Sequence, residues 1–149
     1  MVKVEIEYTE VKKDKEWILY PKGQKPIRVF VDKRIHGEPT RRNIGRGRPK
    51  AFPDTRTVRL PEKGVSQTGV GHEVGHIILG HKSLVEEEQE ITPRFIREEL
   101  EAEYWAYDRG FPKRKYKIID LRELALDIGM TWRQFDKMHR KVKRRLKGR

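Results

Sequence analysis

The segment TGVGHEVGHIILGH, residues 68–81, decides how we expect this chain to fold. It holds three of the five histidines and includes the apolar run from Ile77 to Leu79. Ser66 is a suitable N-cap and Gly80 a suitable stop, so the segment predicts a helix that ends at Leu79. Three glycines inside the helix cost about 1 kcal/mol each relative to alanine. Packing or a bound group must therefore stabilise it.

Two of these histidines are spaced to share one ligand. On a helix, His72 and His76 lie one turn apart on the same face. Both imidazoles can bind one metal ion, and a chain without cysteine has only His, Asp and Glu to offer. In the pattern HExxH, zinc lowers the pKa of its water toward about 7, and the glutamate, here Glu73, accepts the proton as that water attacks a carbonyl. The alternative is a chance pattern whose histidines make ordinary hydrogen bonds.

A catalytic metal site needs a third protein ligand. His81 follows His76 by five residues and would project opposite His72 on a continued helix. We therefore expect His81 to cap the helix or to lie on the surface. A second helix, which Thr92 caps and which ends near Gly110, is the better source of the ligand.

One face of this second helix carries two carboxylates among small residues. Glu99 and Glu103 share the face with Ala102 and Ala106, which would let another helix approach closely. Either glutamate could be the third ligand. The other glutamates nearby are interpreted as a solvated acidic face: Glu86 to Glu88, Glu98 and Glu101.

Together, GHEVGHIILGH and EELEAEYWA resemble the ImmA/IrrE family of small zinc metallopeptidases, whose second helix usually has the pattern E-x-E-A-N-x-F-A. The resemblance covers residues 55–110 and places Glu103 where the family has asparagine. It implies a zincin-like core, zinc as the cofactor and Glu99 as the third ligand. Position 103 would support a ligand, although the change from asparagine to glutamate leaves Glu103 as the alternative ligand.

Alternating apolar residues predict four strands, at 2–8, 16–20, 27–32 and 55–60. We expect a small antiparallel sheet packed on the two helices, an α+β fold. In enzymes of the kind that this chain resembles, the strand before the active-site helix commonly pairs with an extended substrate, so the resemblance implies this role for the strand at 55–60. Glycine and proline predict a long surface loop over 37–53.

The C-terminal part predicts two more helices. Asp120 and Glu123 form a capping box for a helix over 121–128, and Thr131 caps a helix that runs to the C-terminus. With Gly129 at the turn, the two helices have the shape of a helix-turn-helix. Ordinary packing of two amphipathic helices is the alternative.

Basic residues at both ends of the chain indicate nucleic acid as a partner. The sequence RGRPK, with Arg46, Arg48 and Lys50, resembles an AT-hook that lies in the minor groove of A/T-rich DNA. Arg133 and Lys137 are expected to face outward near the start of the last helix. A merely flexible basic loop and a solvated tail are the alternatives.

The composition is that of one strongly charged domain: 149 residues, 39% charged and 35% hydrophobic, with a formal net charge of +12. We divide it into a metallopeptidase core over 1–115 and a basic extension over 116–149 packed on that core.

No apolar stretch approaches the roughly 20 residues of a membrane span, and no signal peptide is evident. We therefore expect a cytoplasmic protein without membrane contact. Abundant Lys, Glu and Arg beside a single Asn are typical of a heat-adapted source.

These patterns predict a zinc-dependent endopeptidase that acts on a protein substrate. The family resemblance implies a DNA-associated transcriptional regulator, such as a repressor, as that substrate. Two alternatives stay open: a DNA-binding regulatory protein whose zinc site is structural or vestigial, and a toxin-like partner in a two-gene module.

Overall fold

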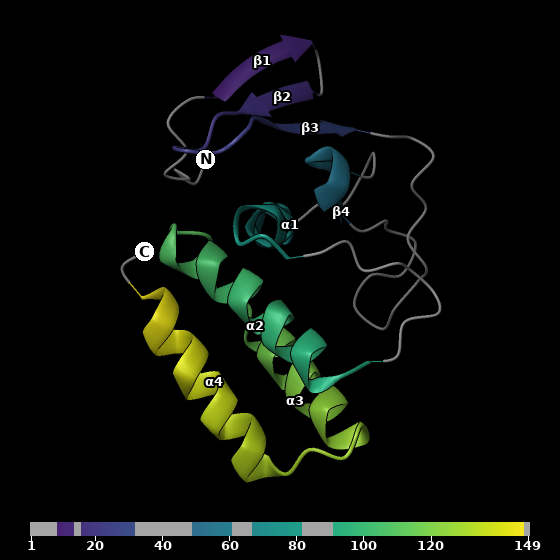
Figure 1. The fold of residues 1–149 in the computed structure, drawn as a ribbon, viewed down its shortest axis with the longest axis vertical. Coiled ribbons are helices and arrows are strands. Elements are labelled where there is room, and N and C mark those ends of the chain that lie inside the picture. Colours follow the sequence, from purple (N-terminus) through teal and green to yellow (C-terminus); the bar gives the residue numbers. More distant parts are fainter. Residues whose placement is uncertain (1–8, 14–15, 32–48, 61–66, 82–90, 148–149) are drawn as a thin grey trace.

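Helix α1 lies between a mixed β-sheet and a bundle of three further helices (Figure 1). The computed structural model describes residues 9–13, 16–31, 49–60, 67–81 and 91–147. The α+β class expected from the sequence is confirmed. The expected strand at 2–8 and the N-cap at Ser66 lie outside the described residues.

The sheet has five strands in the order β1-β2-β3-β5-β4. The strands are β1 (Thr9–Lys13), β2 (Glu16–Leu19), β3 (Ile27–Val31), β4 (Lys50–Phe52) and β5 (Thr57–Leu60). Three pairings are antiparallel, but β3 and β5 run parallel, which the prediction of an antiparallel sheet missed. The parallel pairing arises because β3 does not lead directly into β5. In the chain, β4 and a short 3-10 turn (Pro53–Thr55) come between them, and in the sheet β5 lies between β3 and β4.

The strand order and the bounds of β4 correct two predictions. The strand expected at 55–60 corresponds to β5, which is paired on both sides and has no free edge for a substrate. In the described part of the sheet, β4 is the edge strand on that side. Because β4 occupies residues 50–52, the segment 37–53 is not wholly a loop.

Helix α1 (Gln67–Ile78) packs on the sheet through apolar side chains. This first core contains Ile27, Val29, Val58, Leu60, Val74, Ile77, Trp105, Ala106 and Phe111. In Figure 1, α1 is seen nearly end-on, whereas α2 (Pro93–Asp108) lies across the view, so the two helices cross steeply. As predicted, the Thr92 hydroxyl caps α2 by accepting a hydrogen bond from the backbone N–H of Phe95.

The opposite face of α2 packs on α3 (Lys115–Asp127) and α4 (Trp132–Leu146). This second core contains Ile96, Leu100, Leu121, Ala125, Phe135, Val142 and Leu146. Helix α3 begins at Lys115, so Asp120 and Glu123 lie within it and form no capping box. The prediction failed because the apolar spacing extends one turn further back, to Ile118, which packs against the same core. Thr131 caps α4 in a capping box with Gln134, as predicted for its position.

The loop around Gly129 joins α3 to α4, so the two helices of the expected helix-turn-helix are present. Both pack on α2, and residues 116–149 therefore share a core with the preceding part of the chain over the described range. Among the described residues, none of the helices combines the length and the apolar character needed to span a bilayer.

Candidate metal centre

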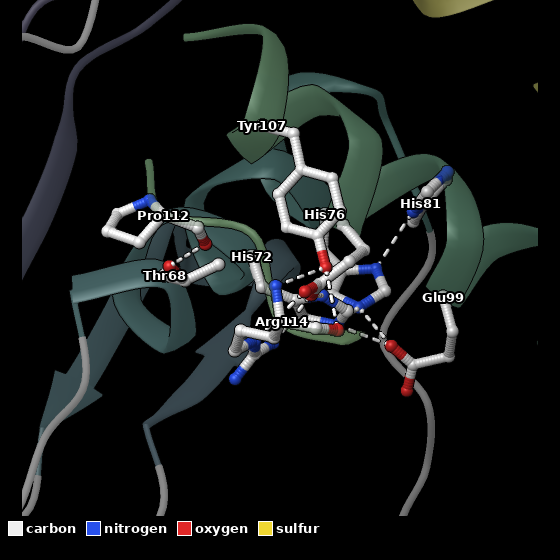
Figure 2. A network of polar contacts seen from close by, with 9 residues as sticks. Thr68, His72, His76, His81, Glu99, Tyr107, Pro112 and Arg114 are labelled. Atoms are coloured by element: carbon white, nitrogen blue, oxygen red, sulfur yellow. Dashed lines mark hydrogen bonds and ion pairs between the residues drawn. The ribbon is translucent and has the colours of Figure 1, made fainter. Parts of the chain in front are cut away.

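Three side chains from α1 and α2 bring their ligand atoms together. One atom each of His72, His76 and Glu99 lies within 4.8 Å of the others, so the group could hold a metal ion. The two Nε2 atoms are 3.0 Å apart, and Glu99 Oε2 lies 2.5 Å from His72 Nε2 and 3.0 Å from His76 Nε2. Figure 2 shows both imidazoles and the Glu99 carboxylate converging on this point.

Close packing of α1 on α2 makes this convergence possible. At Gly75, an added Cβ atom would lie only 3.1 Å from the Ala102 carbonyl oxygen and 3.1 Å from the Trp105 ring. A larger residue would push the helices apart and withdraw Glu99 from the histidines. Gly75, which weakens α1 as an isolated helix, therefore allows the close approach of α2 that assembles the centre. Ala102 serves the same purpose on α2, as its small size predicted.

Glu103 holds the first histidine rather than joining the cluster of His72, His76 and Glu99. Its Oε1 lies 2.8 Å from Nδ1 of His72, which leaves Nε2 of His72 directed at the centre. The Arg114 guanidinium donates two hydrogen bonds to the same carboxylate, from Nε at 2.9 Å and Nη2 at 2.5 Å. Glu103 is 0% exposed. Burial alone would raise the pKa of Glu103, but hydrogen bonds from Arg114 and His72 outweigh it and lower the pKa to about 2.

The neighbouring carboxylates also decide the charge of His72 in the metal-free chain. Burial opposes protonation of His72, but the charge of Glu99 and hydrogen bonds to Glu103 and Glu99 raise its pKa to about 9. Burial likewise opposes ionisation of Glu99, whose pKa nevertheless falls well below its usual value because of His72. In the metal-free chain, a proton on His72 thus neutralises part of the negative charge of the carboxylates. A bound cation would neutralise that charge instead.

His81 is buried beside His76, which corrects the prediction that it caps the helix or lies on the surface. Gly80 adopts φ 73°, a left-handed conformation that suits glycine. The backbone N–H of His81 then bonds the His76 carbonyl at 2.9 Å, and that of Gly80 bonds the Ile77 carbonyl at 3.1 Å. This Schellman turn reverses the chain, so extrapolating a continuous helix past Gly80 gave the wrong direction for His81.

Two glutamates interpreted as solvated are in fact buried. Glu98 is 8% exposed and pairs with Arg94 at 3.0 Å. Glu101 is 7% exposed and lies 3.6 Å from His81 Nε2. The error arose because α2 is covered by other elements on more than one side, which a count of charged residues does not show.

Glu73 connects α1 to the edge of the sheet. Its Oε2 accepts a hydrogen bond from the backbone N–H of Ala51 at 3.1 Å. Because Ala51 is the middle residue of β4, this bond fixes a carboxylate of α1 against the edge strand. The structure therefore places the Glu73 carboxylate against the backbone of β4, whereas the side chain of its neighbour His72 belongs to the cluster with His76 and Glu99.

The residues proposed for nucleic-acid binding are described only in part. Arg46 and Arg48 lie outside the described residues. Lys50 is exposed in β4, and its ammonium lies 5.8 Å from the centroid of the Phe52 ring. Arg133 and Lys137 are both exposed on α4, as expected.

Sequence reasoning missed Arg114 and Ala51, which support Glu103 and Glu73. Neither residue belongs to a local pattern, because each reaches the centre from a different element of the fold. Thr68 is a third such residue: its hydroxyl donates to the Pro112 carbonyl and ties the start of α1 to the segment after α2 (Figure 2).

No known protein family, curated protein or solved structure matches the chain. The assignment of a function therefore depends on the residues and geometry of the centre itself.

Proposed function

We propose that the chain is a zinc-dependent endopeptidase of the HExxH type, with His72, His76 and Glu99 as zinc ligands and Glu73 as the general base. The observation that carries this proposal is the convergence of two imidazole nitrogens from α1 and one carboxylate oxygen from α2. Glu73, which follows His72 in the sequence, directs its carboxylate to Ala51 of β4. Two histidines and one acid are a donor set of catalytic zinc sites, which leave one position open for water or substrate. The resemblance of both helices to the ImmA/IrrE metallopeptidases agrees with this set.

The donors suit zinc because their remaining nitrogens are already engaged. Nδ1 of His72 faces Glu103, and Nδ1 of His76 faces His81, so both Nε2 atoms are directed at the ion site. When bound, zinc would supply Lewis acidity that activates water near neutral pH.

The chain's own residues would then position and deprotonate the reactants. Glu73 would accept the proton of the attacking water, and its bond to Ala51 keeps the carboxylate oriented toward the edge of the sheet. An extended peptide could add to β4 by backbone hydrogen bonds, and if it took the Ala51 N–H it would replace Glu73 Oε2 as the acceptor. This arrangement favours a protein segment in extended conformation as substrate. A transcriptional regulator such as a repressor fits that description, in line with the family resemblance.

The experiment that tests the proposal is digestion of an unfolded protein by the zinc-loaded chain, followed by mass spectrometry of the products. Cleavage should stop when a chelator removes the metal and resume when zinc is restored. The Glu73→Gln variant provides the decisive comparison, because it leaves the zinc ligands in place.

Zinc should stabilise the fold increasingly as the pH rises from about 6 to about 8. Folding raises the pKa of His72 to about 9, so its proton stabilises the metal-free fold fully below its unfolded pKa of about 6.5. That contribution is lost as the pH rises through about 9. Zinc must displace this proton, so its binding strengthens by up to about tenfold per pH unit over the same range.

Thermal unfolding with and without zinc, at several pH values in this range, measures the effect. The increase in Tm on adding zinc should grow with pH. A shift that stays constant would show that no proton leaves His72 when the ion binds.

DNA binding is a second candidate function, favoured by the exposed side of α4. The α4 basic face contains Arg133, Lys137, Arg140, Lys141 and Arg144, all exposed. Their three- and four-residue spacing puts them on the side of the helix opposite Phe135, Val142 and Leu146, which are buried. Guanidinium and ammonium groups in such a row suit a phosphate backbone.

Removing two charges from this face should weaken binding to duplex DNA and lower its dependence on salt. We expect Lys137→Ala/Lys141→Ala to reduce the slope of log affinity against log salt by about two. The control is Lys22→Ala/Lys25→Ala, which removes the same charge from exposed residues between β2 and β3. Equal losses in both variants would mean that net charge, not the α4 basic face, accounts for binding.

A further inference from the structure

We propose that His81 is a positioning residue for the second zinc ligand, His76, and that Glu101 determines which ring nitrogen of His81 carries the hydrogen. This inference rests on the proposed zinc centre and adds to it an outer layer of support that HExxH alone does not contain. His81 contacts His76 but is not one of the three residues whose ligand atoms converge, so its role is to hold His76 rather than to bind the ion.

The contact between the two rings is direct and buried. Nδ1 of His76 lies 2.8 Å from Nδ1 of His81, and Figure 2 shows the dashed line that joins them. The ring centroids are 5.1 Å apart, and the ring planes meet at 63°. Both residues are buried, so water does not compete freely for this hydrogen bond.

The position of His81 in its turn makes this contact unusual. In a Schellman turn, the residue after the glycine commonly makes an apolar contact with the last turn of the helix. Here that residue is His81, and its contact is with His76, so two imidazoles replace the apolar pair. Burying polar nitrogens is unfavourable unless they are hydrogen-bonded, and this pair satisfies one nitrogen of each ring.

The tautomers of the two rings determine which of them donates this hydrogen bond. If Nε2 of His76 binds zinc, Nδ1 of His76 carries the hydrogen and donates it. Nδ1 of His81 must then accept, which leaves the hydrogen of a neutral His81 on Nε2. That Nε2 lies 3.6 Å from Oε1 of Glu101, the acceptor that this tautomer requires.

Glu101 is itself held in place by two cations. Arg97 Nε lies 3.7 Å from its Oε1, and Arg145 Nη1 lies 3.7 Å from its Oε2. Because Arg145 belongs to α4, this ion pair joins the C-terminal helix to the support of His76.

The two ligand histidines are therefore supported in parallel ways. Glu103 reaches His72 directly and is held by Arg114. Glu101 reaches His76 through His81 and is held by Arg97 and Arg145. Outer groups of this kind set the orientation and basicity of a ligand imidazole, and their loss typically weakens metal binding by about 10- to 100-fold.

The test compares zinc affinity, by competition with a chelator, in the wild type, His81→Ala and His81→Asn. We expect His81→Ala to bind zinc about 10- to 100-fold more weakly. The amide oxygen in His81→Asn can still accept from His76, so this variant should recover most of the affinity. The visible spectrum of the cobalt-loaded chain should change in His81→Ala and return toward the wild type in His81→Asn.

The control is His139→Ala, which removes another partly buried imidazole, one that bonds Tyr104 away from the centre. Its zinc affinity should match the wild type. Imidazole nitrogen shifts in NMR spectra of the zinc-loaded chain should report hydrogen on Nε2 of His81, and this preference should weaken in Glu101→Ala.

The outcomes separate the two proposals. If the wild type binds no zinc, the proposed centre is wrong, and the role of His81 falls with it. If the wild type binds zinc and His81→Ala binds it equally well, only the role of His81 is overturned. That role is also overturned if His81→Ala and His81→Asn lose affinity equally, in proportion to a loss of stability in the metal-free chain.

Discussion

Replacement of Glu73 by glutamine is expected to abolish cleavage while leaving zinc bound. Glutamine has the shape of glutamate, and its amide oxygen can still accept the hydrogen bond from the Ala51 backbone N–H. It cannot accept a proton from water, so the proposed general base is lost. Such a loss lowers the turnover rate by about 10²- to 10⁴-fold.

The measurement pairs metal analysis with a rate assay on the same preparation. Glu73→Gln should contain as much zinc as the wild type and should unfold at a similar temperature. The matched control is Glu123→Gln, the same chemical change at an exposed position on α3, which should keep full activity. If Glu73→Gln cleaves its substrate at the wild-type rate, Glu73 is not the base and the HExxH mechanism does not apply.

The sequence was informative wherever function depends on short-range spacing. The separation of His72 from His76 placed two imidazoles on one helix face, and the structure keeps them 3.0 Å apart at Nε2. The face that joins Glu99 to Glu103 could also be predicted from helical periodicity. The sequence left both glutamates open as ligands, and only the packing of α2 on α1 shows Glu99 at the cluster and Glu103 behind His72.

The sequence was uninformative about features that depend on a chain reversal or on contacts between segments that are distant in sequence. His81 turns back because one glycine ends the helix, and helical extrapolation cannot anticipate the result. Insertion of β5 between β3 and β4 depends on pairing between segments that are far apart in sequence. Arg114 reaches Glu103 from beyond the end of α2, and no local pattern marks it. These features are tertiary, so they follow from the fold rather than from periodicity.

The second large effect is expected at Glu99, the proposed third ligand. Glu99→Ala should lose zinc binding by more than the roughly 10- to 100-fold seen when only an outer group is removed. The reason is that Glu99 supplies the only carboxylate oxygen of the described donor cluster, and two imidazoles alone make an incomplete site. Cleavage should disappear with the metal.

The matched control for this change is Glu98→Ala, which removes the adjacent carboxylate and its ion pair with Arg94 but no ligand. This control should retain zinc and activity. Glu103→Gln tests the remaining alternative, because its amide oxygen can still accept from His72. If Glu103→Gln lost zinc while Glu99→Ala kept it, the roles of the two glutamates would have to be exchanged. The geometry predicts the opposite order, since Oε2 of Glu99 lies within 3.0 Å of both Nε2 atoms, whereas Glu103 bonds Nδ1 of His72 and the Arg114 guanidinium.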